Sequence, residues 1–308
     1  MGTIINMVSV SQTFSKFSGG NSISLSSKAA KKCLGSAGIE PSEIGLLINT
    51  GVYRYRNIGE PSIASLVQKR VMGYHKSRIS RSDLPSRDND TFSFDLSEGA
   101  CGWLTGLQII DGFIQAGDIR HGMAVTGDSD PFNGISVNYH FDTAAAAIIL
   151  SGSEKPGGFS NFKAYYYPDF IEEFISATRF EKPVGKRGKR NILFVGQKKT
   201  YLENCIGSAV RSLKKYLNVT GLPMEEIDLV ISSQCPAGLV TGLREQTGLG
   251  QKIIAIENAR GRELHTAGLA FALKKSWDDG SFKSSENIIF LTVGSGISVS
   301  LALYQNKS

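Results

Sequence analysis

A cysteine in a glycine-rich turn is the residue of this chain best placed to do chemistry. It lies in residues 94–104, which read Phe-Asp-Leu-Ser-Glu-Gly-Ala-Cys-Gly-Trp-Leu, so that Cys101 falls between a short apolar run and a segment rich in Leu and Ile. The pattern predicts that Cys101 lies at the N-terminus of a helix, where backbone N–H groups and the helix dipole favour the thiolate. A thiolate in such a turn can accept an acyl group as a thioester.

The elements that would position this turn are repeated along the chain. Residues 38–48 align without a gap on residues 221–231, and the apolar positions just upstream coincide at the same offset, with Cys33 falling on Tyr216. Each copy reads as a helix with apolar residues three and four apart, then a Gly/Pro turn, then a short apolar strand. A match of this length without a gap indicates duplication rather than chance.

A second helix and strand follow in each half. Residues 104–114 have helical spacing and precede the strand-like residues 123–126, while residues 269–273 precede the strand-like residues 288–291. Short, continuous apolar strands are typical of a sheet that is covered on both faces. The sequence therefore predicts a layered α/β fold built from two halves related by a pseudo-twofold axis.

The repeat suggests where the halves begin and end. We expect the first half, with the cysteine turn, to span residues 1–155 and the second half to span residues 197–308. Residues 156–196 are first aromatic and then basic and break the pattern. We interpret them as a connecting or cap segment that shapes the entrance to a site or lines a tunnel.

Composition narrows the class of protein. The 308 residues are 41% hydrophobic and 20% charged, as in ordinary globular proteins, and they hold no run of about 18 apolar residues that would span a membrane. Cys33, Cys101, Cys205 and Cys235 form no Cys-x-x-Cys pair, so we expect neither disulfides nor a metal site. With no secretory signal in view, we expect a reducing, cytoplasmic location.

The net charge of +6 is concentrated in one part of the sequence. Lys186 and Arg187 lie at the centre of a basic cluster in residues 182–199. The cluster is interpreted either as a solvated loop or as a docking patch for an acidic carrier protein or the phosphates of coenzyme A. Because no zinc-finger spacing and no interleaved aromatic residues accompany it, we do not expect nucleic acid as the partner.

Several stretches resemble the thiolase superfamily and, more closely, the 3-oxoacyl-acyl-carrier-protein synthase III group. Residues 49–51 and 60–68 look like the family's first-strand turn and its Pro-Ser-x-Ala helix, and residues 141–150 are similar to its Gly-Asp-Gly-Ala-x-Ala-x-x-Leu strand. The run Gly294-Ser295-Gly296 resembles the family's Gly-rich terminal loop. The resemblance implies the duplicated five-layer αβαβα fold.

The cysteine does not coincide with the family's nucleophile. The family's turn reads Asp-x-x-x-x-Cys-Ser/Ala-Gly, and counting from Asp95 or back from Gly102 puts Ala100 at the cysteine, so Cys101 is one residue late. One residue at a helix start is about 100° of rotation. Either an adjustment of the turn at Gly99 restores the thiol as a working nucleophile, or Cys101 is a buried small hydrophobic residue.

Two further positions differ from the family's pattern. Where the family has His-Gln-Ala-Asn, this chain has Ser233-Gln234-Cys235-Pro236, so Ser233 replaces the family's His as a possible third group. His265 falls where these synthases have the Asn of Gly-Asn-x-Ser, and it is similar to the Gly-His of thiolases. We expect His265 to be a base or an oxyanion donor, the alternative being a structural histidine at a helix start.

Taken with the resemblance, these residues imply an acyltransferase. Cys101 would take an acyl group from coenzyme A or a carrier protein, His265 would assist, and the backbone of Gly294, Ser295 and Gly296 would hold the oxyanion. Arg54 and Arg56, together with the basic cluster, are candidates for contacting the donor. No cofactor is expected beyond the acyl substrate.

Two alternatives come from other classes of function. The chain can be a catalytically silent synthase-like subunit that partners an active homologue, because two of the three expected groups are altered. It can also be a module that binds acyl groups without turnover. The family implies a homodimer, or a heterodimer with a homologue, formed through the sheet of the first half.

Overall fold

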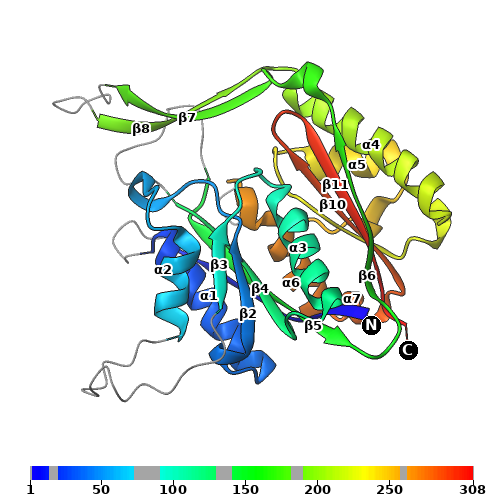
Figure 1. Ribbon diagram of the computed structural model, residues 1–308. Helices are drawn as coiled ribbons and strands as arrows, with labels where there is room; N and C mark the ends of the chain where they lie inside the picture. The colour runs from blue at the N-terminus through cyan, green and yellow to red at the C-terminus, as the bar shows by residue number, and fades with distance from the viewer. Residues whose placement is uncertain are drawn as a thin grey trace, which may run out of the picture.

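The structure, a computed structural model, describes residues 2–13, 20–72, 91–129, 141–181, 190–256 and 262–307. Helices and strands alternate along most of the chain (Figure 1). The strands are β1 (Gly2–Gln12), β2 (Ile44–Asn49), β3 (Phe92–Asp95), β4 (His121–Asp128), β5 (Ala144–Ser153), β6 (Gly158–Tyr166), β7 (Phe174–Glu181), β8 (Arg190–Gln197), β9 (Leu229–Ser232), β10 (Asn287–Gly294) and β11 (Ser298–Gln305). The helices are α1 (Ser22–Ala37), α2 (Ile63–Met72), α3 (Gly102–Ala116), α4 (Tyr201–Thr220), α5 (Leu239–Thr247), α6 (Gly268–Asp278) and α7 (Ser281–Ser284).

Two mixed sheets carry the duplication. The first has the order β1-β5-β4-β2-β3 and the second the order β6-β11-β10-β9. In each sheet the first strand of the half pairs antiparallel with the last, β1 with β5 and β6 with β11. The parallel pair β2·β4 in the first sheet has its counterpart in β9·β10. The predicted repeat is therefore confirmed as a repeat of topology.

The helix ends of the repeat coincide residue by residue. Gly38 ends α1 and Gly221 ends α4, with φ of 66° and 69°, and each backbone N–H bonds back to the last turn of its helix. Glycine reaches this left-handed conformation without steric cost, which is why the sequence stops both helices here. Cys33 and Tyr216, the paired positions upstream, are both fully buried.

The elements stack in five layers, as expected from the resemblance. Helices α1 and α2 cover the outer face of the first sheet, and α4 and α5 cover the outer face of the second. Helices α3 and α6 lie between the two sheets, where they contact strands of both (Figure 1). The central layer thus places the N-termini of two helices, one from each half, between the sheets.

Helix α3 is held deep in this central layer. Trp103, Leu107 and Ile110 have no exposed surface, and burial of each such side chain stabilises the fold by about 1.5–3 kcal/mol. Gly106 lets the helix approach β2 closely, because a Cβ there would lie 3.1 Å from Thr50 Cγ2. The cysteine turn that precedes α3 is therefore fixed by packing against strands on both sides.

The segment expected to be a connection, residues 156–196, is divided differently in the structure. Its first part forms β6, a strand of the second sheet, and its later part forms the β7–β8 hairpin. Composition hid β6 because the strand lies at a sheet edge. Beyond Phe159 its residues are half-buried or exposed, and the aromatic Tyr166 is 68% exposed. The hairpin extends away from the sheets toward the first half (Figure 1).

Candidate functional site

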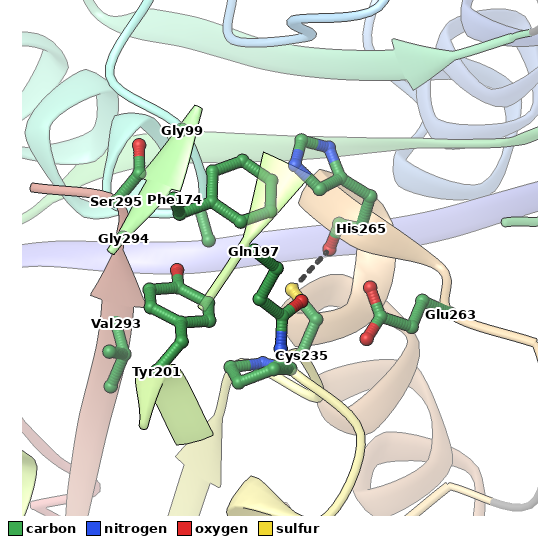
Figure 2. Close-up of a pocket in the computed structure, with 12 residues that line it drawn as sticks. Gly99, Phe174, Gln197, Tyr201, Cys235, Glu263, His265, Val293, Gly294 and Ser295 are labelled. Atoms are coloured by element: carbon green, nitrogen blue, oxygen red, sulfur yellow. Dashed lines mark hydrogen bonds between the residues drawn. The ribbon is translucent and has the colours of Figure 1, made fainter. Parts of the chain in front are cut away.

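A pocket opens where the two halves meet, at the carboxyl ends of the parallel strands (Figure 2). Its cavity volume is about 30 Å³. We call it the His265 pocket. The cysteine turn contributes Gly99 and Ala100, the hairpin and the start of α4 contribute Phe174, Gln197 and Tyr201, and the second half contributes Cys235, Pro236, Glu263, His265, Val293, Gly294 and Ser295.

Cys101 is the N-cap residue of helix α3, at the helix start as predicted, but its thiol does not line this pocket. The side chain is fully buried against the β10–β11 hairpin, where Sγ lies 3.4 Å from Ser298 O and 3.7 Å from Thr292 O. Ser298 Oγ donates to the same sulfur at 3.4 Å. The expectation that Cys101 faces the cavity with His265 is therefore wrong.

Ala100 occupies the place that the thiol was expected to take. Its methyl lines the His265 pocket, whereas the next side chain turns into the hairpin. Gly99 adopts a φ of 53°, yet this left-handed turn does not rotate Cys101 back to the pocket. The approximate 100° between successive helical positions is enough to explain the difference.

The surroundings of Cys101 also oppose ionisation. Burial raises the pKa of the thiol, and the hydrogen bonds from Ser298 and Thr292 only partly offset it. A buried thiol with a raised pKa has little thiolate and behaves as a small apolar side chain. The helix start alone does not activate it.

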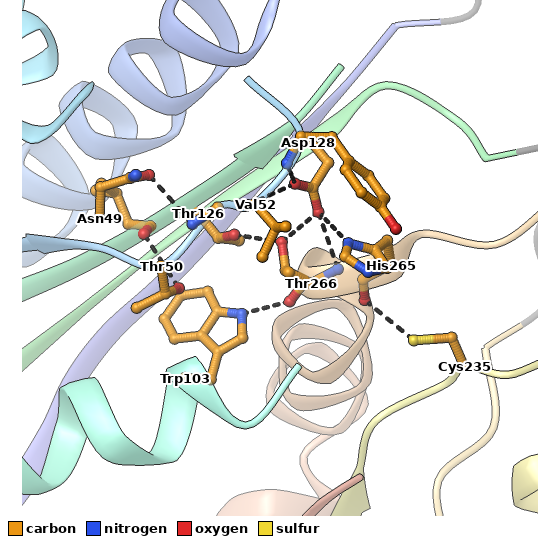
Figure 3. Close-up of polar contacts among 12 residues, drawn as sticks. Asn49, Thr50, Val52, Trp103, Thr126, Asp128, Cys235, His265 and Thr266 are labelled. Carbon is orange, nitrogen blue, oxygen red and sulfur yellow. Dashed lines mark hydrogen bonds and ion pairs between the residues drawn. The ribbon is translucent and has the colours of Figure 1, made fainter. Parts of the chain in front are cut away.

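His265 lies in the pocket wall with a partner that sequence analysis missed. Its Nδ1 is 2.7 Å from Oδ2 of Asp128, a fully buried carboxylate at the carboxyl end of β4 (Figure 3). No hydrogen bond to Nε2 of His265 is found among the described residues. An imidazole held in this way by a carboxylate presents its second nitrogen as a base or donor.

Asp128 is satisfied on every side by donors. Oδ1 accepts the backbone N–H groups of Val52 at 2.9 Å and Tyr53 at 2.7 Å, and Oδ2 accepts the Thr266 N–H at 3.1 Å and its hydroxyl at 2.5 Å. Burial favours the neutral acid, but the His265 imidazole and these hydrogen bonds outweigh burial and lower the pKa of Asp128 below its ordinary value of 3.8. The carboxylate is therefore ionised at neutral pH.

Thr266 ties this pair to both halves of the fold (Figure 3). Its carbonyl accepts the indole N–H of Trp103 in α3 at 2.5 Å, and its hydroxyl lies 2.5 Å from the hydroxyl of Thr126 in β4. These bonds leave the 3-10 turn His265–Ala267 little freedom to move. The geometry of the His265–Asp128 pair is thus set by buried groups from both halves.

The backbone of His265 is strained. Its φ is 42°, in the left-handed region that a residue with a Cβ adopts at a cost of about 1–3 kcal/mol. The Tyr53 ring stacks on the imidazole with centroids 4.3 Å apart, and Tyr53 in turn contacts Phe141. A strained residue that is held by a buried network is typical of a functional position.

Ser233 is not placed to act in the pocket. It is 1% exposed, and its hydroxyl accepts the backbone N–H of Val293 at 2.8 Å, which ties β9 to β10. The next residue but one, Cys235, does line the pocket, and its Sγ donates to the carbonyl of His265 at 3.6 Å (Figure 2). Burial raises the pKa of this thiol as well.

The other predicted site residues are distributed as follows. Gly294 and Ser295 line the pocket, whereas Gly296 lies in the turn beyond them with a φ of 98°. Arg54 pairs with Asp95 at 3.2 Å and lines a different cleft, and Arg56 lies over the ring of Tyr55. Lys186 and Arg187 lie outside the described residues.

In the described part of the chain, no cluster of three or more His, Cys, Asp or Glu side chains has the arrangement of a metal site. None of the helices described has the length and apolar character that a bilayer span needs.

Comparisons with known proteins agree with this architecture. The beta-ketoacyl-acyl-carrier-protein synthase III 2 of Vibrio vulnificus is 24% identical over 287 residues, which cover 90% of this chain and 73% of that protein. The synthase III of Aquifex aeolicus is 21% identical over 277 residues, or 89% of this chain and 80% of that protein. No family-wide sequence profile matches the chain.

Solved structures show the same fold. The crystal structure of the Aquifex aeolicus synthase III superposes with a TM-score of 0.78 at 18% identity and covers 99% of this chain and 100% of its own. OleA from Xanthomonas campestris, in a structure with bound lauric acid and lauroyl-CoA, gives a TM-score of 0.77 at 17% identity and covers 99% of both chains.

The two sheets with their three helical layers are therefore the thiolase-like fold. In sequence and in fold, the chain is similar to the 3-oxoacyl-acyl-carrier-protein synthase III proteins named above.

Proposed function

We propose that this chain binds an acyl thioester of coenzyme A or a carrier protein in the His265 pocket and transfers the acyl group directly to an acceptor. The transfer does not pass through a thioester on Cys101. The observation that carries this proposal is the buried His265–Asp128 pair beside Ala100, at the place where a cysteine nucleophile was expected. The relatives named above support the class of donor.

The chemistry needs one base and one leaving thiol. Nε2 of His265 takes the proton from a hydroxyl or amine of the acceptor as its oxygen or nitrogen bonds to the thioester carbonyl carbon. The C–S bond then breaks, and the proton passes from Nε2 to the leaving thiolate, so that free thiol and acylated acceptor are formed. Asp128 stabilises the imidazolium between the two steps.

The pocket also offers a place for the developing oxyanion. Gly294 and Ser295 line the wall at the end of β10, next to the cysteine turn. Backbone N–H groups at such a position stabilise negative charge on a carbonyl oxygen. This part of the proposal retains the role expected for the glycine-rich terminal loop.

The test uses lauroyl-CoA with a panel of small alcohols and amines, and the release of free CoA is followed by chromatography. We expect turnover with at least one acceptor. In His265→Gln the turnover rate should fall about 10²–10⁴-fold, while the affinity for lauroyl-CoA stays within about twofold of wild type. The matched control is Cys101→Ser, which is expected to turn over at the wild-type rate. Loss of turnover in Cys101→Ser with retained folding would contradict the proposal.

A second candidate function is a subunit that binds acyl groups but is silent by itself. The methyl of Ala100 in the pocket and the structural role of Ser233 favour it, because both positions differ from the family's pattern. It predicts a measurable affinity for lauroyl-CoA without CoA release, together with co-purification of a homologous synthase. Turnover by the isolated chain eliminates it.

We further propose that the chain pairs through the first sheet. Among the described residues β3 pairs with β2 alone, which leaves its other edge open, and Phe92 on this strand is 59% exposed. An open edge strand with an exposed aromatic residue is a site for pairing with another chain. In a homodimer, or in a heterodimer with a homologue, a strand of the second chain pairs with the open edge of β3.

A further inference from the structure

The His265 pocket holds an acidic side chain in addition to the His265–Asp128 pair. Glu263 lines the pocket two residues before His265, and its carboxylate points toward the interior (Figure 2). Among the described residues that line the pocket, none is Lys or Arg. A substrate that enters therefore meets a wall with a carboxylate in it.

The backbone and the side chain of Glu263 are both held in place. The carbonyl of Glu263 accepts the N–H of Asp142 at 2.9 Å, in a bridge that joins the two halves of the fold. Its Oε1 accepts the N–H of Ala237 at 2.8 Å, in the turn that leads to α5. Because the two oxygens of a carboxylate offer about four acceptor sites, a carboxylate anchored in this way can also accept from a substrate.

Two neighbouring groups respond to the charge of Glu263. Burial raises the pKa of the Cys235 thiol well above its ordinary value, and the carboxylates of Glu263 and Asp128 raise it further. Burial is also the main cause that raises the pKa of Tyr201, and Glu263 adds to it. Both groups line the pocket. A negative field that opposes a thiolate and a phenolate there favours a cation at the same place.

Aromatic rings form another part of the wall. Phe174 and Tyr201 both line the pocket, and their ring centroids lie 5.2 Å apart at an interplanar angle of 30°. The face of an aromatic ring attracts an organic cation, and such rings line the sites of many alkylammonium ligands. The wall thus combines a carboxylate with aromatic rings, the two kinds of group that bind an ammonium ion.

The same wall disfavours an anionic acceptor. A carboxylate on the acceptor would bring a further negative charge beside Glu263 and the buried, ionised Asp128. Like charges repel strongly where water is excluded. Arg262, the neighbour of Glu263 in the chain, pairs with Asp142 at 3.8 Å and does not line the pocket.

The group of the acceptor that faces His265 should be neutral. An aliphatic amine with a pKa of about 10.4 is protonated at neutral pH and must lose a proton before it can attack. A hydroxyl enters neutral and gives up its proton to the base as it attacks. An acceptor with an ammonium group and a hydroxyl therefore suits both Glu263 and His265.

We propose that the acceptor is a small amino alcohol, whose ammonium group binds between Glu263 and the two aromatic rings while its hydroxyl faces Nε2 of His265. This inference rests on the proposed function, which places the donor thioester beside the same imidazole. The hydroxyl oxygen bonds to the thioester carbonyl carbon, and its proton passes to Nε2. The C–S bond then breaks, and the proton passes to the leaving thiolate. The products are an ester of the amino alcohol and a free thiol.

The test compares a cationic acceptor with a neutral one of the same shape. Dimethylethanolamine is protonated at neutral pH, and in isoamyl alcohol a CH group replaces its N–H group with the same branching. A tertiary amine forms no stable amide, so both compounds are acylated on the hydroxyl. The release of CoA from lauroyl-CoA gives kcat and KM for each acceptor.

Two variants accompany wild type. Glu263→Gln removes the charge but keeps an oxygen that can accept the Ala237 N–H, so the turn before α5 should be retained. The matched control is Glu172→Gln, because the Glu172 side chain is 84% exposed, pairs with Lys198 and lies outside the pocket. Thermal unfolding checks that each variant is folded.

We expect wild type and Glu172→Gln to prefer the cationic acceptor about tenfold in kcat/KM, chiefly through a lower KM. In Glu263→Gln the ratio of the two kcat/KM values should fall to within about twofold of unity, because KM for the cationic acceptor rises. Should Glu263→Gln fail to fold, the comparison of the two acceptors in wild type decides alone.

Equal kcat/KM of wild type for the two acceptors overturns the inference, and so does a preference that survives in folded Glu263→Gln. Both results leave the proposed function standing, since the acyl group is still transferred. The absence of CoA release with every alcohol and amine of the panel would overturn the proposed function as well.

Discussion

Ala100 and Cys101 are neighbours in the chain but face different parts of the molecule. The methyl of Ala100 lines the His265 pocket, and the thiol of Cys101 is buried against Ser298 in the β10–β11 hairpin. The separation follows from the rotation between successive positions at the start of a helix. It changes the chemistry of the site, because the group expected to carry the acyl chain is absent from the pocket.

Removal of the Cys101 thiol should have little effect on the site. We expect Cys101→Ser to lower the free energy of unfolding by about 1 kcal/mol, since a buried hydroxyl can keep the hydrogen bonds to the hairpin carbonyls. Affinity for lauroyl-CoA should not change. Denaturant titration and calorimetry check both parts, and a loss of donor binding in a folded Cys101→Ser protein would contradict the placement of this thiol.

Reactivity toward a small alkylating reagent should distinguish the cysteines. All four thiols are buried, but Cys235 borders the His265 pocket. We expect iodoacetamide to modify Cys235 before Cys33, Cys101 and Cys205, and lauroyl-CoA to slow the reaction. Peptide mapping by mass spectrometry measures the order. The Cys235→Ser variant is the control, and earlier modification of Cys101 would be inconsistent with the structure.

Much of the fold could be predicted from sequence because the duplication is visible in it. The gapless repeat identified α1 with α4 and β2 with β9, and glycines at the helix ends fixed the alignment. Strand β6 was missed because most of this edge strand is half-buried or exposed, so it lacks a continuous apolar run. The β7–β8 hairpin was also missed, although its second strand buries Ile192, Leu193 and Val195.

The site was harder to predict, for reasons that concern particular residues. Asp128 lies far from His265 in the sequence, and nothing in its own neighbourhood marks it as a partner. Its place as the last residue of a buried strand was the available signal, since ligand sites of α/β proteins lie at carboxyl ends of strands. Whether Cys101 or Ala100 faced the pocket depended on one residue of rotation, which spacing alone left open.

The ionised Asp128 should make stability depend on pH in the acid range. The pKa of Asp128 is lower in the folded chain than its ordinary value of 3.8. Its contribution is therefore fully present above about pH 3.8 and is lost as the pH falls through the lower, folded-state pKa. Asp128→Asn should cost about 3 kcal/mol at neutral pH, and the difference from wild type should shrink below about pH 3.8. Denaturant titrations over this range measure it, and a difference independent of pH would contradict the assignment.

The open edge of β3 gives a prediction about assembly. We expect the wild-type chain to form a dimer in solution and Phe92→Asp to weaken it, because a charge on an edge strand opposes pairing between chains. Light scattering coupled to size-exclusion chromatography measures the mass. Val219→Asp is the control, since Val219 is also exposed, at 66%, but lies on α4 of the second half. Equal masses for wild type and Phe92→Asp would rule out this edge as the interface.

The most direct test is the intact mass of the protein after incubation with lauroyl-CoA. It is measured for wild type and for Ala100→Cys, which introduces a thiol into the pocket wall beside His265. We predict that wild type keeps its mass and that Ala100→Cys gains a single lauroyl group. A lauroyl adduct on Cys101 of the wild-type chain would contradict the account.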